Sequence, residues 1–371
     1  MEGDQIRIHK WLIPLSWLYE AGTEGRNALF DMEILKSRSF QIPIINVGNI
    51  TVGGTGKTPH VEYLIRLLSP KYKVAVLSRG YKRKSKGYIL ANENSTVEEI
   101  GDEPWQLKKK FPHIYVAVEA NRCKGIERLL SDEATQDVEV ILLDDAYQHR
   151  YVKPGMNILL TDYHRLITED RLLPAGRLRE KATGKSRANI IIVTKCPTQL
   201  TPMEYRVIEK KLQPMPFQQL YFSTFSYGNL QGMFNGESLP LEQLKQSNIL
   251  LLTGIGNPKQ MEMDIQPYAC SVKSITFADH HFFCTEEIER IHQEFKSLPH
   301  PRLIVTTEKD ATRLQNRQDL PLEIKEHIYS LPIEVQFARN STSKFNEKLL
   351  RYVHKNQRDS KLAKGKNDHK S

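Results

Sequence analysis

The feature that most constrains the fold is a series of short, continuously apolar segments that alternate with helical patterns between residues 41 and 194. The clearest of these segments are IPIINV (42–47), KVAVLS (73–78), IYVAV (114–118), VEVILLDD (138–145), NILLTD (157–162) and NIIIVTK (189–195). Strands without polar alternation are typical of parallel sheets that helices cover on both faces. The sequence therefore predicts an α/β fold with a mostly parallel sheet, extending over residues 41–215.

The pattern changes on either side of this core. Residues 216–240 are rich in Gly, Ser and aromatic side chains, which predicts a β-ribbon linker. The β/α alternation then resumes, so that 241–355 is expected to form a smaller α/β domain. Residues 1–40 are predicted to be a helical segment that precedes the core, and 356–371 to be a basic, disordered tail.

The composition is that of a soluble globular protein. A chain of 371 residues with 39% hydrophobic and 26% charged residues can form about two domains. The four cysteines show no metal-ligand spacing, which favours free thiols in a reducing compartment. No signal peptide and no membrane-spanning apolar run is recognisable, so we expect a cytoplasmic protein that at most touches a membrane. The formal charge of +9 does not by itself indicate nucleic-acid binding.

The stretch IHKWLIPLSWLYEAG (8–22) allows two interpretations. Trp11, Leu15 and Leu18 share one helical face, with Trp17, Tyr19 and basic residues nearby. Such a helix can pack on the core, or it can lie in the headgroup region of a bilayer.

The stretch NITVGGTGKTPH (49–60) follows a predicted strand and opens a predicted helix. Its glycines allow backbone N–H groups to surround phosphates, and a Lys and a Thr follow where a phosphate loop needs them for phosphate and Mg²⁺. The first glycine of the general pattern is replaced by a threonine. The predicted ATP-binding residues are Thr51, Val52, Gly53, Gly54, Thr55, Gly56, Lys57 and Thr58.

Carboxylates and histidines supply candidates for the rest of the site. Asp144 and Asp145 end a buried strand, from which a carboxylate can reach Mg²⁺. Asp102, in GDEPWQL, is placed either to cap a helix or to act as a general base. In FADHH, His280 or His281 can be a partner of such a base or simply a buried turn residue.

Several further residues are weaker candidates, because each can equally be a solvated surface group. Basic and polar residues near strand ends could contact substrate or phosphate, and Glu180 could support Mg²⁺. The substrate and phosphate candidates are Arg79, Arg122, Gln148, His149, Arg179 and His281.

Taken in order, these motifs resemble those of the lipid A 4′-kinase (tetraacyldisaccharide 4′-kinase) family. The matching segments are GNITVGGTGKTPH, LSRGYKRKSKG, GDEPWQL, LLDDAYQHR, LLPAGRLRE, VTKCP, FADHH and VTTEKDATRL. The resemblance covers roughly residues 12–315, and the family also carries Thr or Ser where Thr51 stands.

The resemblance implies a P-loop kinase that uses ATP and Mg²⁺. It would phosphorylate the 4′-hydroxyl of a tetraacyl-glucosamine disaccharide 1-phosphate, a lipid A precursor. Asp102 matches the family's general base, and His280 matches its assisting histidine better than His281. A substrate with four acyl chains stays in the bilayer, so the resemblance favours the interfacial reading of residues 8–22. We expect a monomer, peripheral on the cytoplasmic face of the inner membrane.

Two rival functions remain on the residues alone. One is a P-loop kinase of a soluble sugar, and the other is a nucleotide-switch ATPase that binds a protein partner. A switch needs only a positioned water, so the acid and histidine of FADHH argue against it.

Overall fold

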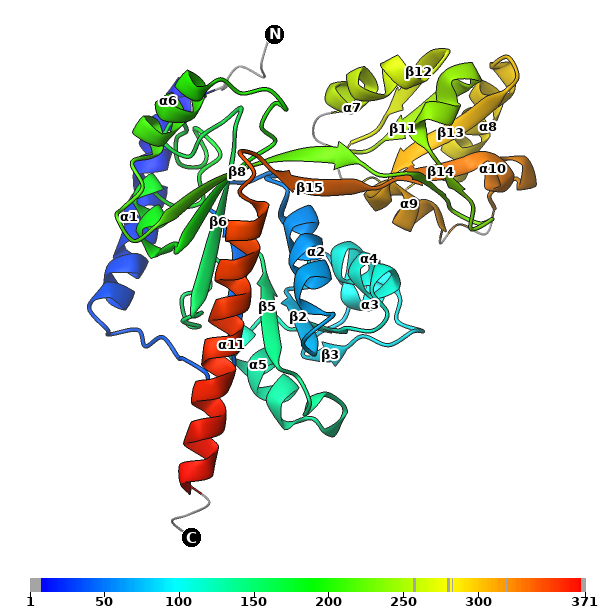
Figure 1. Ribbon diagram of the computed structural model, residues 1–371. Helices are drawn as coiled ribbons and strands as arrows, with labels where there is room; N and C mark the ends of the chain where they lie inside the picture. Colours follow the sequence, from blue (N-terminus) through cyan, green and yellow to red (C-terminus); the bar gives the residue numbers. More distant parts are fainter. Residues whose placement is uncertain are drawn as a thin grey trace. The chain divides into compact units, whose positions relative to one another are not determined.

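The computed structural model describes residues 8–255, 258–278, 281, 283–315, 317 and 319–367 (Figure 1). Contacts divide them into two compact units. The first holds the described residues up to Phe225 and those from Val335 on, and the second holds those between Ser226 and Glu334.

The division differs in two respects from the predicted boundaries. It assigns the first part of the predicted linker 216–240, up to Phe225, to the first unit and the rest to the second. The prediction also extended the smaller domain to residue 355 and began a disordered tail at 356. The last strand and the last helix belong to the first unit, because Phe337, Phe345 and Leu349 are buried in its core. That helix continues to Asn367.

The first unit is built on a sheet that has nine strands among the described residues. Across the sheet they are β15 (Ile333–Phe337), β8 (Gln219–Tyr227), β7 (Ile190–Thr194), β6 (Met156–Asp162), β1 (Ile44–Asn49), β5 (Val140–Asp144), β2 (Val74–Ser78), β4 (Tyr115–Val118) and β3 (Ile89–Leu90). Every pairing from β8 to β4 is parallel, and β3 runs antiparallel to β4. The carboxyl ends of the parallel strands therefore share one edge, where α/β sheets bind ligands.

The central strands are buried on both faces, as their apolar sequences predict. In β5, Val140 and Leu142 join one core cluster, whereas Ile141 and Leu143 join the cluster on the opposite face. Helices cover the two faces. They are α1 (Ile13–Asp31), α2 (Lys57–Leu68), α3 (Val97–Ile100), α4 (Asp102–Lys110), α5 (Arg122–Ser131), α6 (Pro202–Leu212) and α11 (Thr342–Asn367), with short 3-10 turns η1 (Lys10–Leu12), η2 (Glu133–Thr135) and η3 (Ala182–Arg187).

The second unit has its own sheet, of six strands in the described part of the chain. Their order is β10 (Ser238–Leu239), β9 (Leu230–Gly232), β14 (Ile328–Leu331), β13 (Arg302–Thr307), β11 (Asn248–Thr253) and β12 (Ser271–Thr276). The four strands from β14 to β12 are parallel, whereas β9 and β10 are antiparallel. The helical elements of this unit are η4 (Leu241–Gln246), α7 (Pro258–Ile265), η5 (Gln266–Tyr268), α8 (Thr285–Ser297), α9 (Glu308–Gln315) and α10 (Leu322–His327).

Candidate functional site

The predicted phosphate-binding loop connects β1 to α2, with strand, loop and helix in the predicted order. Gly53 and Gly56 have φ angles of 112° and 81°, which L side chains rarely adopt. Gly56 directly precedes α2, so the unpaired N–H groups of the first turn, and the positive end of the helix dipole, lie at the loop. Such a helix N-terminus is suited to an anion.

Thr51 has a different backbone role from the glycines that follow it. It forms an antiparallel bridge with Leu178, flanked by a hydrogen bond from Val52 N to Arg177 O at 2.7 Å. The residue is buried and is not among those with a positive φ. A threonine is therefore compatible with this position, because the paired backbone does not need the freedom of glycine.

Buried polar side chains hold the loop from behind. Asn49 Nδ2 donates to Thr55 Oγ1 at 2.7 Å, and Thr194 Oγ1 donates to Thr55 O at 3.0 Å. The ring of His60 contacts Gly56 O at 2.7 Å through Nδ1 and Ser223 Oγ at 3.0 Å through Nε2. A carbonyl only accepts, so Nδ1 carries the proton, and burial lowers the pKa of His60 to about 4.

The two predicted acids at the end of β5 have different surroundings. Asp145 is partly exposed and forms ion pairs with Lys57 at 3.6 Å and Arg179 at 3.2 Å. Its φ of 48° is unusual for a residue with a side chain, and such strain is frequent at functional sites. A bound phosphate would therefore compete with Asp145 for the ammonium group of Lys57.

Asp144 is only 3% exposed and lacks a full set of partners. Ser78 Oγ donates to its Oδ2 at 3.2 Å, whereas its buried Oδ1 has no hydrogen-bond partner among the described residues. Burial, followed by the charges of Glu103 and Asp145, raises the pKa of Asp144 to about 7. A buried carboxylate of this kind is stabilised by a cation.

The oxygens around Asp144 fit Mg²⁺. Thr58 Oγ1 donates to Glu103 Oε1 at 3.3 Å, and the charge of Glu103 acts on Asp144. Within the described ranges, no group of three or more His, Cys, Asp or Glu side chains could hold a metal alone. This is compatible with a Mg²⁺ that keeps water and phosphate oxygens and takes only one or two protein ligands. The sequence did not assign a role to Glu103; its only signal was the position next to Asp102.

A second polar group joins the loop to the segment after Leu178. Gln148 Nε2 donates to Asn49 O at 2.6 Å and to Glu180 Oε1 at 3.2 Å. Both carboxylate oxygens of Glu180 accept from Arg187 Nη2, at 2.8 and 2.7 Å. Glu180 is thus buried and already paired with a guanidinium, a partner that sequence reasoning missed.

The remaining candidates of the first unit lie near the end of β5. Arg122 is buried and donates to Asp144 O at 3.2 Å and to Glu119 O at 2.9 Å, while burial lowers its pKa to about 10. Arg122 N donates to His149 Nε2 at 3.4 Å, and burial lowers the pKa of His149 to about 4. Arg79, directly after β2, is exposed.

The predicted base is the first residue of α4. It follows Gly101, whose φ is 90°, and precedes Glu103, whose carboxylate contacts Thr58. Asp102 is therefore brought to the N-terminal end of α2 by the packing of α4.

Of the two predicted histidines, His281 belongs to the second unit. His280 lies outside the described residues. His281 contacts Glu287 Oε2 at 2.7 Å and stacks on Phe277, with ring centroids 4.9 Å apart.

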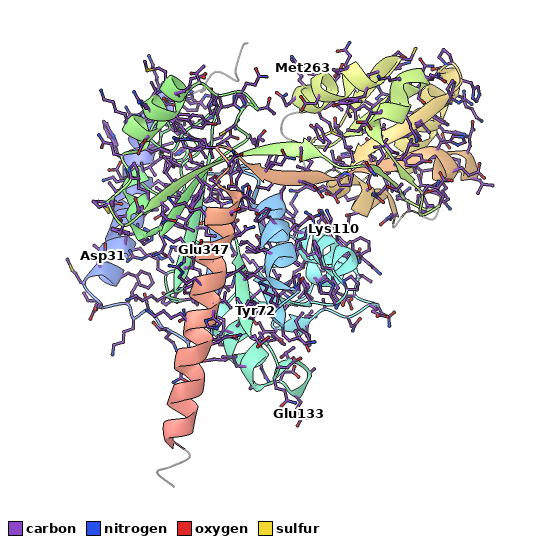
Figure 2. The ribbon with its side chains drawn as sticks, viewed as in Figure 1. Asp31, Tyr72, Lys110, Glu133, Met263 and Glu347 are labelled. Atoms are coloured by element: carbon purple, nitrogen blue, oxygen red, sulfur yellow. The ribbon has the colours of Figure 1, made fainter. Side chains whose placement is uncertain are left out.

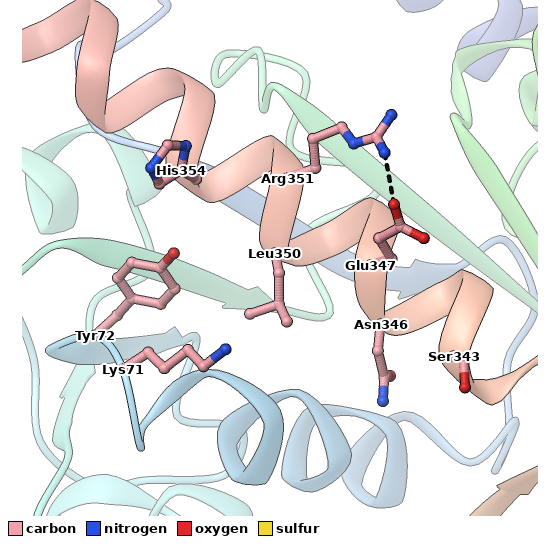
Figure 3. Close-up of a pocket in the computed structure, with 8 residues that line it drawn as sticks. All are labelled: Lys71, Tyr72, Ser343, Asn346, Glu347, Leu350, Arg351 and His354. Carbon is pink, nitrogen blue, oxygen red and sulfur yellow. Dashed lines mark hydrogen bonds and ion pairs between the residues drawn. The ribbon is translucent and has the colours of Figure 1, made fainter.

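A surface cavity of about 580 Å³ lies elsewhere, between the turn after α2 and α11 (Figure 3). Its lining residues are Lys71, Tyr72, Ser343, Asn346, Glu347, Leu350, Arg351 and His354. It is at the opposite end of α2 from the phosphate loop, so we do not assign it to the nucleotide.

Comparisons with known proteins show which family the chain belongs to. The model of the family described as tetraacyldisaccharide-1-P 4′-kinase (LpxK) matches residues 8–354. A tetraacyldisaccharide 4′-kinase from Phocaeicola vulgatus is 54% identical over 98% of this chain and 100% of its own. One from Bacteroides thetaiotaomicron is 52% identical with both chains fully covered.

A solved structure gives the same result for the fold. The LpxK of Aquifex aeolicus, crystallised in complex with ATP, has a TM-score of 0.72 and 30% sequence identity, with 93% of this chain and 99% of that chain covered. The likeness confirms the predicted fold class. The chain belongs to the tetraacyldisaccharide 4′-kinase family and is a kinase.

Proposed function

We propose that this kinase transfers the γ-phosphoryl group of ATP to the 4′-hydroxyl of a tetraacyl-glucosamine disaccharide 1-phosphate, with the residue roles given below. The observation that carries the proposal is the convergence of the phosphate loop, the pair Asp144 and Asp145, and the start of α4 at the carboxyl edge of one sheet.

Residues of the loop hold the nucleotide. The amides from Gly53 to Thr58 surround the phosphates. The ammonium of Lys57, which is paired with Asp145 in the structure, interacts also with the transferring phosphoryl group. Arg179 stays beside Asp145 and compensates its charge. Gln148 links the loop to Arg179, and its own orientation is fixed by Glu180, which is paired with Arg187. We therefore assign Glu180 an orienting role rather than direct metal binding.

Thr58, Asp144 and Glu103 would hold Mg²⁺. The ion would supply positive charge to the transferring phosphate. The protein's part is to keep these three oxygen groups within reach, with Ser78 fixing one oxygen of Asp144.

Asp102 acts as the general base and accepts the proton of the 4′-hydroxyl as this oxygen attacks the phosphorus. His280 assists it, as the family resemblance implies. A positioned base contributes about 10²–10⁴ in rate. Positioning and charge neutralisation supply most of the rest.

The exposed face of α1 suits a substrate that stays in a bilayer. On α1, Leu18 is 72% exposed, and Leu15, Trp17 and Leu29 are exposed as well. Trp11, on the preceding turn η1, is 77% exposed. No helix in the described ranges is both long and apolar enough to traverse a bilayer. We propose peripheral binding of a monomer to the cytoplasmic face of the inner membrane, with these side chains at headgroup level.

Transfer of label from γ-labelled ATP tests this function. The acceptor is the tetraacyl disaccharide 1-phosphate in mixed micelles, and the product is analysed for phosphate at the 4′ position. We expect a labelled lipid. Equal transfer to soluble sugars would favour the first rival function, and release of inorganic phosphate alone would favour the second.

A further inference from the structure

Helices α2 and α4 carry the two halves of the proposed catalytic machinery at their N-terminal ends. Lys57 and Thr58 begin α2, and Asp102 and Glu103 begin α4. The two helices are separate in sequence, so something other than chain connectivity must fix how far one slides or turns against the other.

A row of polar side chains joins the two helices. Thr58, Glu62 and Arg66 are spaced four residues apart on α2 and therefore share a face. Glu103, Gln106 and Lys110 are spaced by three and four residues on α4 and share a face in the same way. We call these six residues the polar seam.

Contacts across the seam follow the two helices away from the site. Nearest to the site, Thr58 Oγ1 donates to Glu103 Oε1 at 3.3 Å. One turn further, Gln106 Nε2 donates to Glu62 Oε1 at 3.2 Å. The ammonium of Lys110, which is labelled in Figure 2, lies 2.6 Å from Glu62 Oε2.

Glu62 is at the centre of this row and is only 2% exposed. A buried carboxylate tolerates little displacement of its partners, because any loss of them leaves a charge without compensation. Arg66, 3.6 Å from the same carboxylate, adds a second positive charge from α2 itself. The seam therefore resists sliding of α4 along α2 more strongly than an apolar contact would, since apolar contacts are not directional.

We propose that Glu62 is a positioning residue for phosphoryl transfer: through Gln106 and Lys110 it sets the register of α4 on α2, and thereby the place of Glu103 and Asp102 relative to Thr58. This rests on the proposed function of Asp102 and Glu103. Glu62 itself touches neither nucleotide nor lipid in this role.

The test compares Glu62→Gln and Lys110→Met with the double variant, in the full-length protein. Turnover with the lipid acceptor, the dissociation constant of ATP and the melting temperature are measured for each. Displacement of α4 should lower kcat at least five-fold in each single variant, while ATP binding stays within two-fold of wild type. The losses should combine less than multiplicatively, because both substitutions break the same contact.

Tyr63→Phe is the matched control on the next residue of α2. It removes the hydrogen bond from Tyr63 to Asn346 of α11, at 2.7 Å, and leaves the seam intact. Its kcat should equal that of wild type when assayed well below its melting temperature.

A purely structural role of Glu62 would lower the melting temperature and leave kcat of the folded variant unchanged, and that result would overturn the proposal. An equal loss of kcat and of ATP binding would overturn it as well. If Glu62→Gln does not fold, the partly exposed Lys110 provides the decisive variant.

Asp102→Ala in the same assay separates this inference from the one on which it rests. An inactive Asp102→Ala beside fully active seam variants overturns the seam alone. An active Asp102→Ala beside slow seam variants removes the base assignment and leaves the positioning of Glu103 supported.

Discussion

Two regions of the first unit invert the usual distribution of polar and apolar side chains. At the carboxyl edge of the sheet, charged groups such as Asp144 and Arg122 are buried. On η1 and α1, by contrast, Trp11 and Leu18 are exposed. Each arrangement is unfavourable for an isolated soluble protein. We infer that a different ligand relieves each one: phosphate with its cation at the sheet edge, and the bilayer at α1.

The largest effect in this comparison is expected from a substitution at the sheet edge that leaves α1 intact. Lys57→Ala should lower kcat/KM for ATP by about 10²–10³, the usual cost of one lost donor to a developing charge. The same substitution should leave binding to vesicles unchanged. Steady-state kinetics and vesicle sedimentation measure the two effects. Equal loss of both would contradict the separation.

The converse change is on η1 and α1. Replacing Trp11 and Leu18 together by Ser removes two side chains that would each contribute about 1.5–3 kcal/mol to burial in lipid. Partitioning into anionic vesicles should fall by roughly 100-fold or more, with ATP affinity unchanged.

Leu322→Ser is the control for α1, because Leu322 is 71% exposed and lies on α10. It should leave partitioning unchanged. An equal effect in the control would show that general hydrophobicity, and not the face of α1, drives membrane binding.

The support of the loop makes stability depend on pH. His60 is neutral in the folded protein, with its pKa lowered by burial from 6.5 to about 4. Between those values His60 binds a proton in the unfolded chain and none in the folded chain, so the contribution of His60 to the free energy of unfolding falls as the pH falls, by roughly 3 kcal/mol over the window. Urea unfolding from pH 7 to 4 measures it. His60→Gln should show a shallower decline; an unchanged slope would assign the effect to other groups.

The smallest effect is expected at Thr51. Because its backbone is paired with Leu178 and needs no positive φ, Thr51→Gly should change KM for ATP less than three-fold. Loss of the side chain from a paired segment should cost about 1 kcal/mol of stability. A ten-fold or larger change in KM would show that the side chain itself contacts the nucleotide.

Contiguous motifs were predictable from the sequence, whereas contacts between separate elements were not. The loop and the end of β5 follow from local patterns, because a buried strand and a glycine turn fix where the next side chains lie. The role of Glu103, the pairing of Glu180 with Arg187 and the seam at Glu62 depend on how helices and loops pack, which residue spacing within one segment does not encode. The smaller unit was predicted to end too far along the chain for the same reason, because β15 pairs with β8 and α11 packs in the core of the first unit, both distant in sequence.

The most direct test of the account is phosphoryl transfer by Asp102→Ala, measured at saturating ATP and lipid together with ATP binding. Loss of a base at the start of α4 should lower kcat by about 10²–10⁴ and leave the dissociation constant of ATP unchanged. Near-normal kcat, with label still appearing at the 4′ position, would contradict the proposed site.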